Sequence, residues 1–145
     1  METRRFLITG GSQGIGSAVV HQARKAGHQV VFTGRNDSHI QSTVKDTGAH
    51  GIKADVSNDA DNQRVVDEAL KKMGGIDVLI NNAAFGYNAE IGMLDMSTMR
   101  NLFATNVFGA VDITNRVVPH MKAQQAGDIV NLASTSGDHI TLYTR

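Results

Sequence analysis

Short apolar runs alternate with amphipathic segments along the chain. The runs that predict strands lie at 6–9, 30–32, 52–55, 76–80 and 129–132. Each run is nearly continuous in apolar residues, which is typical of parallel strands that helices cover on both faces. The pattern therefore favours buried strands over strands that keep one face in water.

Apolar residues at helical spacing fill the segments between these runs. We expect helices at 14–26, around Ile40 as far as Gly48, across 65–73 and along 96–124. Strands that alternate with helices form βαβ units, in which the strands pair in parallel and the crossovers are right-handed. The sequence thus predicts an α/β fold of Rossmann type, with three αβα layers around a parallel sheet.

The longest predicted helix, at 96–124, has an apolar stripe that we expect to face the core. Pro119 is expected to bend or cap part of this helix. The apolar side chains expected to point inward are Leu102, Phe103, Val107 and Val111.

Composition narrows the class of function. The 145 residues fit one domain, at 1–145, and 14 basic residues balance 14 acidic ones. No basic run predicts a nucleic-acid or membrane partner, and no apolar run is long enough to cross a bilayer. The N-terminus lacks the features of a signal peptide, and the absence of cysteine fits a cytoplasmic location. The six histidines show no metal-ligand spacing, so we expect no metal.

A glycine-rich turn joins the first predicted strand to the first helix, with the sequence Thr-Gly-Gly-Ser-Gln-Gly-Ile-Gly at 9–16. Gly10 permits a sharp turn, Gly14 lets the backbone approach a pyrophosphate, and Gly16 lets the helix pack closely on the strand. Free N–H groups at the helix N-terminus would bind the phosphate. A turn without a ligand is the alternative, which the motif spacing and the strand–turn–helix context disfavour.

This turn resembles the cofactor signature of classical short-chain dehydrogenases/reductases. Three further motifs follow at the spacing of that family: Asn-Asn-Ala-Ala at 81–84, Ala-Thr-Asn-Val around Asn106, and Asn-Leu-Ala-Ser-Thr-Ser-Gly at 131–137. Ala84 stands where the family has glycine. The resemblance implies a sheet in the strand order 3-2-1-4-5 and an oxidoreductase that interconverts a carbonyl and an alcohol.

The end of the second strand indicates which nicotinamide cofactor is bound. Acidic residues there accept hydrogen bonds from the ribose 2′-hydroxyl of NAD. In this chain Gly34 occupies the position where the family's NAD enzymes carry aspartate, and Arg35 follows. A guanidinium can hold a 2′-phosphate with paired hydrogen bonds, so the sequence favours NADP(H) over NAD. A solvated loop arginine is the alternative, and Asp37 is expected to cap a helix.

Residues on the adenosine side follow from the same resemblance. Asp55 either accepts from the adenine amino group or caps neighbouring N–H groups, and both interpretations stay open. Asn81 is expected to be structural and to tie adjacent strands together. The complete set of predicted cofactor residues is Gly10, Ser12, Gln13, Gly14, Ile15, Gly16, Arg35, Asp55, Val56, Asn82, Ala83 and Ala84.

The resemblance also implies the catalytic residues. In the family a serine orients the carbonyl, an asparagine holds a water of the proton relay, and a Tyr-x-x-x-Lys motif supplies the proton. Ser134 and Asn106 match the first two, whereas Tyr143 lies too close to Ser134 to match the tyrosine. We therefore expect the 145-residue chain to be truncated before that motif and inactive alone. The alternative is a catalytically dead dinucleotide-binding or sensing module.

The fifth strand is expected to be a sheet edge. By resemblance a sixth strand would cover it, and without that strand the residues at 129–132 present unpaired backbone groups. Such an edge recruits another strand, so we expect self-association, as a homo-oligomer or an aggregate. The other expected partner is a small carbonyl or alcohol substrate.

Overall fold

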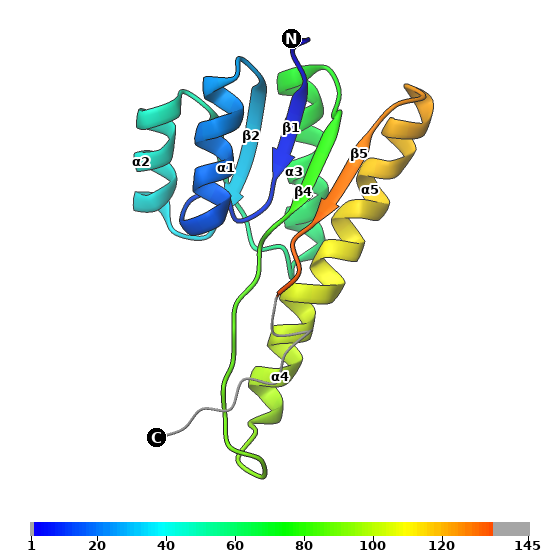
Figure 1. The fold of residues 1–145 in the computed structure, drawn as a ribbon. Coiled ribbons are helices and arrows are strands. Elements are labelled where there is room, and N and C mark those ends of the chain that lie inside the picture. The colour runs from blue at the N-terminus through cyan, green and yellow to red at the C-terminus, as the bar shows by residue number, and fades with distance from the viewer. Residues whose placement is uncertain (1, 135–145) are drawn as a thin grey trace.

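The computed structural model describes residues 2–134 of the chain. It contains a parallel five-stranded sheet in the order β3-β2-β1-β4-β5 (Figure 1). This confirms the predicted fold class and strand order. The strands are β1 (Arg5–Ile8), β2 (Gln29–Gly34), β3 (His50–Lys53), β4 (Val78–Asn81) and β5 (Asp128–Asn131).

Helices cover both faces of the sheet. One layer holds α1 (Gly14–Lys25) and α2 (Asp37–Thr47), and the other holds α3 (Asp59–Met73) and α5 (Ala110–Ala123). Directly before α5 lie α4 (Met96–Phe103) and a π-helical segment, η1 (Ala104–Gly109). Together these three elements form one rod that extends beyond the sheet edge where the strands end (Figure 1).

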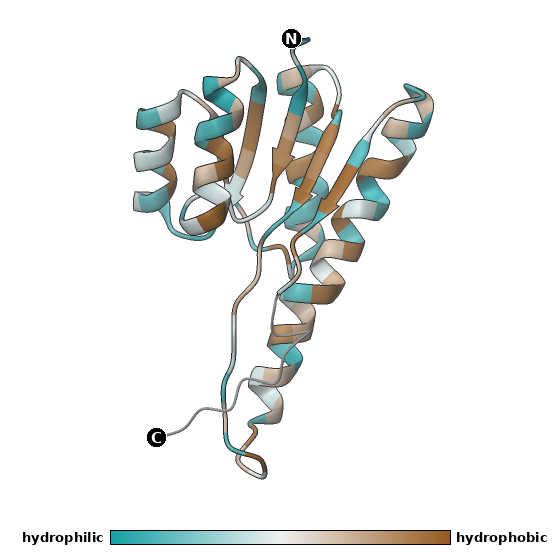
Figure 2. Ribbon diagram, in the orientation of Figure 1, coloured by the Kyte–Doolittle hydropathy of each residue, from teal (hydrophilic) through white to brown (hydrophobic). Residues whose placement is uncertain are grey.

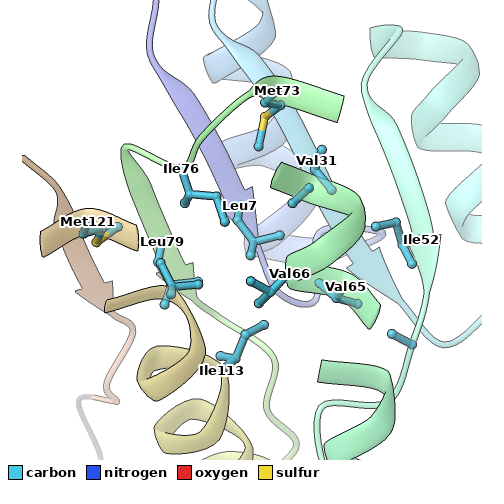
Figure 3. Close-up of a cluster of buried hydrophobic side chains, with 13 residues drawn as sticks. Leu7, Val31, Ile52, Val65, Val66, Met73, Ile76, Leu79, Ile113 and Met121 are labelled. Carbon is cyan, nitrogen blue, oxygen red and sulfur yellow. The ribbon is translucent and has the colours of Figure 1, made fainter. Parts of the chain in front are cut away.

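The central strands β1, β2 and β4 divide their apolar side chains between two cores. Leu7, Val31 and Leu79 pack against α3 and α5 in the larger cluster (Figure 3). Their neighbours along the same strands, such as Ile8 and Phe32, pack against α1 and α2. The strands are therefore apolar on both faces, as Figure 2 shows in brown, which explains their continuous apolar runs.

Every predicted strand differs from the observed one by one or two residues at its ends, and the third and fourth differ by two at their starts. The third strand begins at His50, two positions before the predicted 52–55, because His50 and Gly51 already pair with β2. Neither residue carries a strand signal, so the apolar pattern starts too late. The fourth strand was predicted from Ile76, which is fully buried but lies before the ladder that begins at Val78.

The prediction for the long helix is wrong in its inward face. Phe103, Val107 and Val111 are 46%, 41% and 54% exposed, and Leu102 is half-buried. The buried residues repeat at every fourth position instead: Thr105, Gly109, Ile113, Val117 and Met121.

The predicted and the observed faces both repeat every four residues and are offset by two positions, so the apolar stripe was assigned to the wrong side of the helix. Gly109 lies where this helix contacts the loop after β3, because a Cβ at position 109 would lie 2.5 Å from the carbonyl oxygen of Val56. Pro119 lies inside α5, which continues past it to Ala123, so this proline does not cap the helix.

At the sheet edge where the strands begin, charged residues tie β1 to the start of β4. The Asp77 carboxylate accepts hydrogen bonds from the backbone N–H and the Nε of Arg5, each at 2.8 Å. The hydrogen bond from the Arg5 side chain lowers the pKa of Asp77. Arg4 forms an ion pair with Asp128 at the start of β5. None of the helices within residues 2–134 is long and apolar enough to cross a bilayer.

Candidate functional site

A cavity of about 460 Å³ lies at the edge where the strands end. Parallel strands all present their carboxyl ends at this edge, so the loops after β1, β2, β3 and β4 meet there. Residues from all four loops line the cavity. Every predicted cofactor residue is among them: Gly10, Ser12, Gln13, Gly14, Ile15, Gly16, Arg35, Asp55, Val56, Asn82, Ala83 and Ala84.

The glycine-rich turn is as tight as its sequence predicts. Gly10 and Gly14 have positive φ angles of 65° and 56°, a conformation that favours glycine. At Gly16 a Cβ would lie 2.2 Å from the Gly10 carbonyl oxygen and 2.4 Å from Nδ2 of Asn82. The first turn of α1 can therefore approach the end of β1 only because position 16 has no side chain.

The N-terminus of α1 differs from those of the other α-helices that begin from a loop. Its N-cap residue, Gln13, makes no side-chain hydrogen bond to the helix. Side chains of Asn36, Asn58 and Asp95 cap α2, α3 and α4. The first N–H groups of α1 are thus left for an anion in the cavity. Ile15, in the same turn, is 67% exposed and adds an apolar surface.

The segment after β4 is locked to the end of β1. Nδ2 of Asn82 donates to the carbonyl oxygens of Thr9 and Gly10, both at 3.0 Å. In return, Oγ1 of Thr9 accepts from the backbone N–H groups of Asn82 and Ala83, also at 3.0 Å. This reciprocal set holds one wall of the cavity in place against the turn.

Asn81, the residue before this segment, ties neighbouring elements together as predicted. Its Nδ2 donates to Oγ1 of Thr114 on α5 at 3.0 Å and to Oδ1 of Asn131 on β5 at 2.8 Å. Its side chain is buried and does not line the cavity.

The loop after β2 contributes an arginine with no counter-charge. Arg35 lines the cavity and is exposed, and within residues 2–134 its side chain has no hydrogen-bond or ion-pair partner. At Gly34 a Cβ would lie 2.4 Å from Oγ and 2.7 Å from Cβ of Ser12. The fold therefore disfavours a side chain of any kind at position 34.

The interpretation of Asp37 as a helix cap is wrong by one residue. Asn36 caps α2, because its Oδ1 accepts the backbone N–H of His39 at 3.1 Å. Asp37 is the first residue of the helix, and its carboxylate lies 2.6 Å from Nζ of Lys53 on β3. This ion pair neutralises the Asp37 carboxylate, which is the carboxylate nearest to Arg35 in the sequence.

Asp55 organises the loop after β3. Its Oδ1 accepts from the N–H and the hydroxyl of Ser57, at 2.9 and 2.7 Å, and its own N–H donates to Asp61. The bond from Asp55 and a further one from Arg64 lower the pKa of Asp61. The capping role that the sequence left open is thus present, while Oδ2 of Asp55 makes no bond to any residue in 2–134.

Asn106 lies in the π-helical segment and supports the loop after β4. Its Oδ1 accepts the N–H of Phe85 at 3.0 Å, and its Nδ2 donates to the carbonyl of Phe85 at 2.9 Å. Both ends of the amide are therefore engaged with backbone. Ser134, the other catalytic candidate, follows β5 at the same sheet edge and is exposed.

Six residues that line the cavity were not among the predicted cofactor residues: Thr33, Gly34, Asn36, His39, Ala54 and Thr105. Thr33 ends an apolar strand, and Thr105 directly precedes Asn106, so each looked like a structural neighbour of a motif. His39 lies in the first turn of α2, four residues after Arg35 of the preceding loop, and no motif marked it.

Some predicted features lie outside the described residues. These are Tyr143 and the end of the serine motif, at 135–137. Among residues 2–134, no group of three or more histidine, aspartate or glutamate side chains is placed to hold a metal ion.

The chain matches the short chain dehydrogenase family over residues 4–144. It is 33% identical over 139 residues to the ketoacyl reductase HetN of Nostoc sp., covering 92% of this chain and 48% of that protein. It is 30% identical over 137 residues to a 3-ketodihydrosphingosine reductase of Bacteroides thetaiotaomicron, covering 94% and 49%. The chain thus spans about half the length of these curated relatives.

Solved structures agree with this result. A crystal structure of a variant of actinorhodin polyketide ketoreductase with NADPH superposes with a TM-score of 0.92 at 26% identity, over 97% of this chain and 56% of that one. A short-chain dehydrogenase from Streptomyces avermitilis gives 0.89 at 29% identity, over 95% and 52%.

The turn geometry generates a prediction for Gly16. We expect Gly16→Ala to weaken binding of NADPH by at least about tenfold, because the new Cβ must push the Gly10 carbonyl and Asn82 apart. Fluorescence titration would measure the affinity, with thermal unfolding recorded alongside it. Gly86→Ala is the matched control, since a Cβ at Gly86 would meet nothing within 4 Å. Equal affinity of the Gly16 variant and the unmodified chain would contradict the prediction.

Proposed function

Since this chain belongs to the short-chain dehydrogenase/reductase family, we propose that it binds NADP(H) and serves an oxidoreductase that interconverts a carbonyl and an alcohol. One observation carries the proposal: the uncapped N-terminus of α1 and the unpaired guanidinium of Arg35 line the same cavity. A dinucleotide with a 2′-phosphate needs one anion site at its pyrophosphate and another at its ribose.

The residues present fit this cofactor. The pyrophosphate would lie against the turn at 10–16, where the α1 dipole and its free N–H groups favour negative charge. Arg35 would hold the 2′-phosphate, and Gly34 leaves no carboxylate to repel it. Ala83 and Asp55 would line the adenosine half of the cofactor. Oδ2 of Asp55 would accept a hydrogen bond either from water or from the adenine amino group.

The comparisons support a ketone as the oxidised substrate. Relatives named for ketoacyl and ketodihydrosphingosine reduction cover nearly the whole chain, and an NADPH-bound ketoreductase shares its fold. We therefore favour carbonyl reduction, with NADPH as the source of hydride.

In this proposal Ser134 orients the carbonyl by donating a hydrogen bond to its oxygen, where negative charge develops. Asn106 acts as a positioning residue through its side chain, because both of its amide atoms hold the backbone of Phe85. This bond fixes the segment that continues from Asn82 and Ala83 along the cavity. A role for Asn106 in a proton relay would have to use its backbone.

A second candidate function is a dinucleotide-binding module without catalysis. The complete phosphate turn fits both candidates, so cofactor binding alone does not separate them.

Self-association is part of the proposal. Every residue of β5 is exposed, including Val130 at 44%, and β5 forms an edge of the described sheet. A second apolar surface lies on the rod of α4, η1 and α5, where Phe103, Val107 and Val111 form an exposed stripe. We propose that a second copy of the chain covers the β5 edge, since unpaired strand edges recruit strands.

The first test concerns cofactor preference. We expect the chain to bind NADPH more tightly than NADH and Arg35→Asp to reverse this order, because a carboxylate repels the 2′-phosphate and accepts from a 2′-hydroxyl. Fluorescence titration of both cofactors measures the two affinities. Lys25→Asp, at the far end of α1, makes the same charge change away from the cavity. Equal affinities in the unmodified chain would remove the role given to Arg35.

The second test concerns catalysis. We expect the isolated 145 residues to bind NADPH without reducing ketones or aldehydes, because loss of a positioned general acid costs roughly 10²- to 10⁴-fold. In a protein that joins this chain to a Tyr-x-x-x-Lys segment, we expect turnover that Ser134→Ala nearly abolishes. NADPH oxidation with a panel of carbonyl compounds measures both. Robust Ser134-dependent turnover by the isolated chain would contradict the first expectation, and inactivity of the joined protein would favour the binding module.

The third test concerns association. We expect the 145-residue chain to sediment as dimers or larger species at micromolar concentration and Val130→Lys to shift it toward monomer, since an edge lysine blocks strand pairing. Val111→Lys provides the comparison on the helical stripe. A stable monomer in the unmodified chain would show that the β5 edge is protected.

A further inference from the structure

A second group that is able to carry positive charge lines the cavity. His39 lines the same cavity as Arg35, Ser12 and Asn36, although no motif marked it. The cavity wall therefore carries two nitrogen-rich side chains around the position that the proposed function gives to the 2′-phosphate.

The helix cap fixes the position of His39. Asn36 caps α2 by accepting the backbone N–H of His39 at 3.1 Å and the hydroxyl of Ser38 at 2.6 Å. His39 thus lies in the first turn of α2, whose N-terminus lies near the sheet edge where the strands end (Figure 1). The cap uses only the backbone of His39. Its imidazole is exposed and has no hydrogen-bond or ion-pair partner in the part of the chain that the structure describes.

The charges around His39 favour an anion. Arg35 lies in the loop before α2. On α2 itself, the carboxylate of Asp37 forms an ion pair with Lys53 of β3 at 2.6 Å. The other charged residue that lines the cavity is Asp55, from the loop after β3, and Ser57 already binds one of its oxygens. No described carboxylate forms an ion pair with either Arg35 or His39.

We infer that His39 is a second ligand of the 2′-phosphate of NADP(H) and binds it as an imidazolium beside Arg35. This inference rests on the proposed function and adds a specificity residue to its site. A phosphate monoester has three acceptor oxygens, so a guanidinium and an imidazolium can bind it together. Because an imidazole changes its charge between about pH 5 and 8, the preference for the 2′-phosphate becomes dependent on pH.

The phosphate itself gives the opposite trend. A phosphate monoester gains negative charge as the pH rises through about 6, which strengthens its attraction to Arg35. The imidazolium contribution therefore has to be isolated by comparing variants at each pH, rather than by following the unmodified chain alone.

The experiment uses 2′,5′-ADP and 5′-AMP, which differ only in the 2′-phosphate, and measures their binding to the 145-residue chain by calorimetry at pH 6 and pH 8. We expect His39→Gln to weaken 2′,5′-ADP roughly tenfold at pH 6, the loss of one charge-assisted hydrogen bond, and by less than about threefold at pH 8. His39→Arg should keep tight binding at both pH values. Binding of 5′-AMP should not change in either variant.

The control is His120→Gln, which removes an exposed imidazole from α5, away from the cavity. Thermal unfolding of each variant separates loss of binding from loss of fold. The inference is overturned if His39→Gln binds 2′,5′-ADP as the unmodified chain does at pH 6, or loses the same factor at both pH values. If the unmodified chain binds both nucleotides equally, the proposed NADP(H) preference fails as well. If Arg35→Ala removes the preference and His39→Gln does not, only the inference fails.

Discussion

The close approach of three backbone segments at the end of β1 is the constraint on which the site depends. The glycine-rich turn, the first turn of α1 and the segment after β4 meet where Gly16 lacks a side chain. Asn82 and Thr9 then exchange hydrogen bonds across this junction. The same contacts place α1 on the sheet and aim its uncapped N-terminus at the cavity, so helix packing and anion binding have one origin.

Much of the architecture could be predicted from the sequence, because two kinds of signal agree. Apolar runs such as that of β2 indicate strands that are buried on both faces, and the glycines around Gly10 mark the turn that joins strand to helix. Every predicted cofactor residue lines one cavity for a topological reason, since parallel strands end at the same edge. Positions 50 and 51 were missed because backbone pairing with β2, and not side-chain hydrophobicity, makes them strand.

A periodic apolar pattern does not by itself show which face of the long helix meets the sheet. Phe103, Val107 and Val111 were predicted as the core face because they form the apolar stripe, whereas the buried face is offset by two positions and includes Thr105 and Gly109 of the π-helical segment. Gly109 allows that segment to touch Val56, a contact between distant parts of the chain. His39 was overlooked for a related reason, since its place in the cavity depends on how α2 starts at Asn36.

The steric contact between Gly34 and Ser12 has a consequence for how cofactor preference could evolve. A Cβ at position 34 would lie 2.7 Å from the Cβ of Ser12, so rotation of the Ser12 hydroxyl does not relieve the clash. An acidic residue at position 34 therefore requires glycine at position 12 first, because alanine would keep the Cβ, whereas a change at Arg35 meets no such barrier. Positions 12 and 34 are therefore epistatic, and we expect lineages of this sequence to replace Ser12 before Gly34.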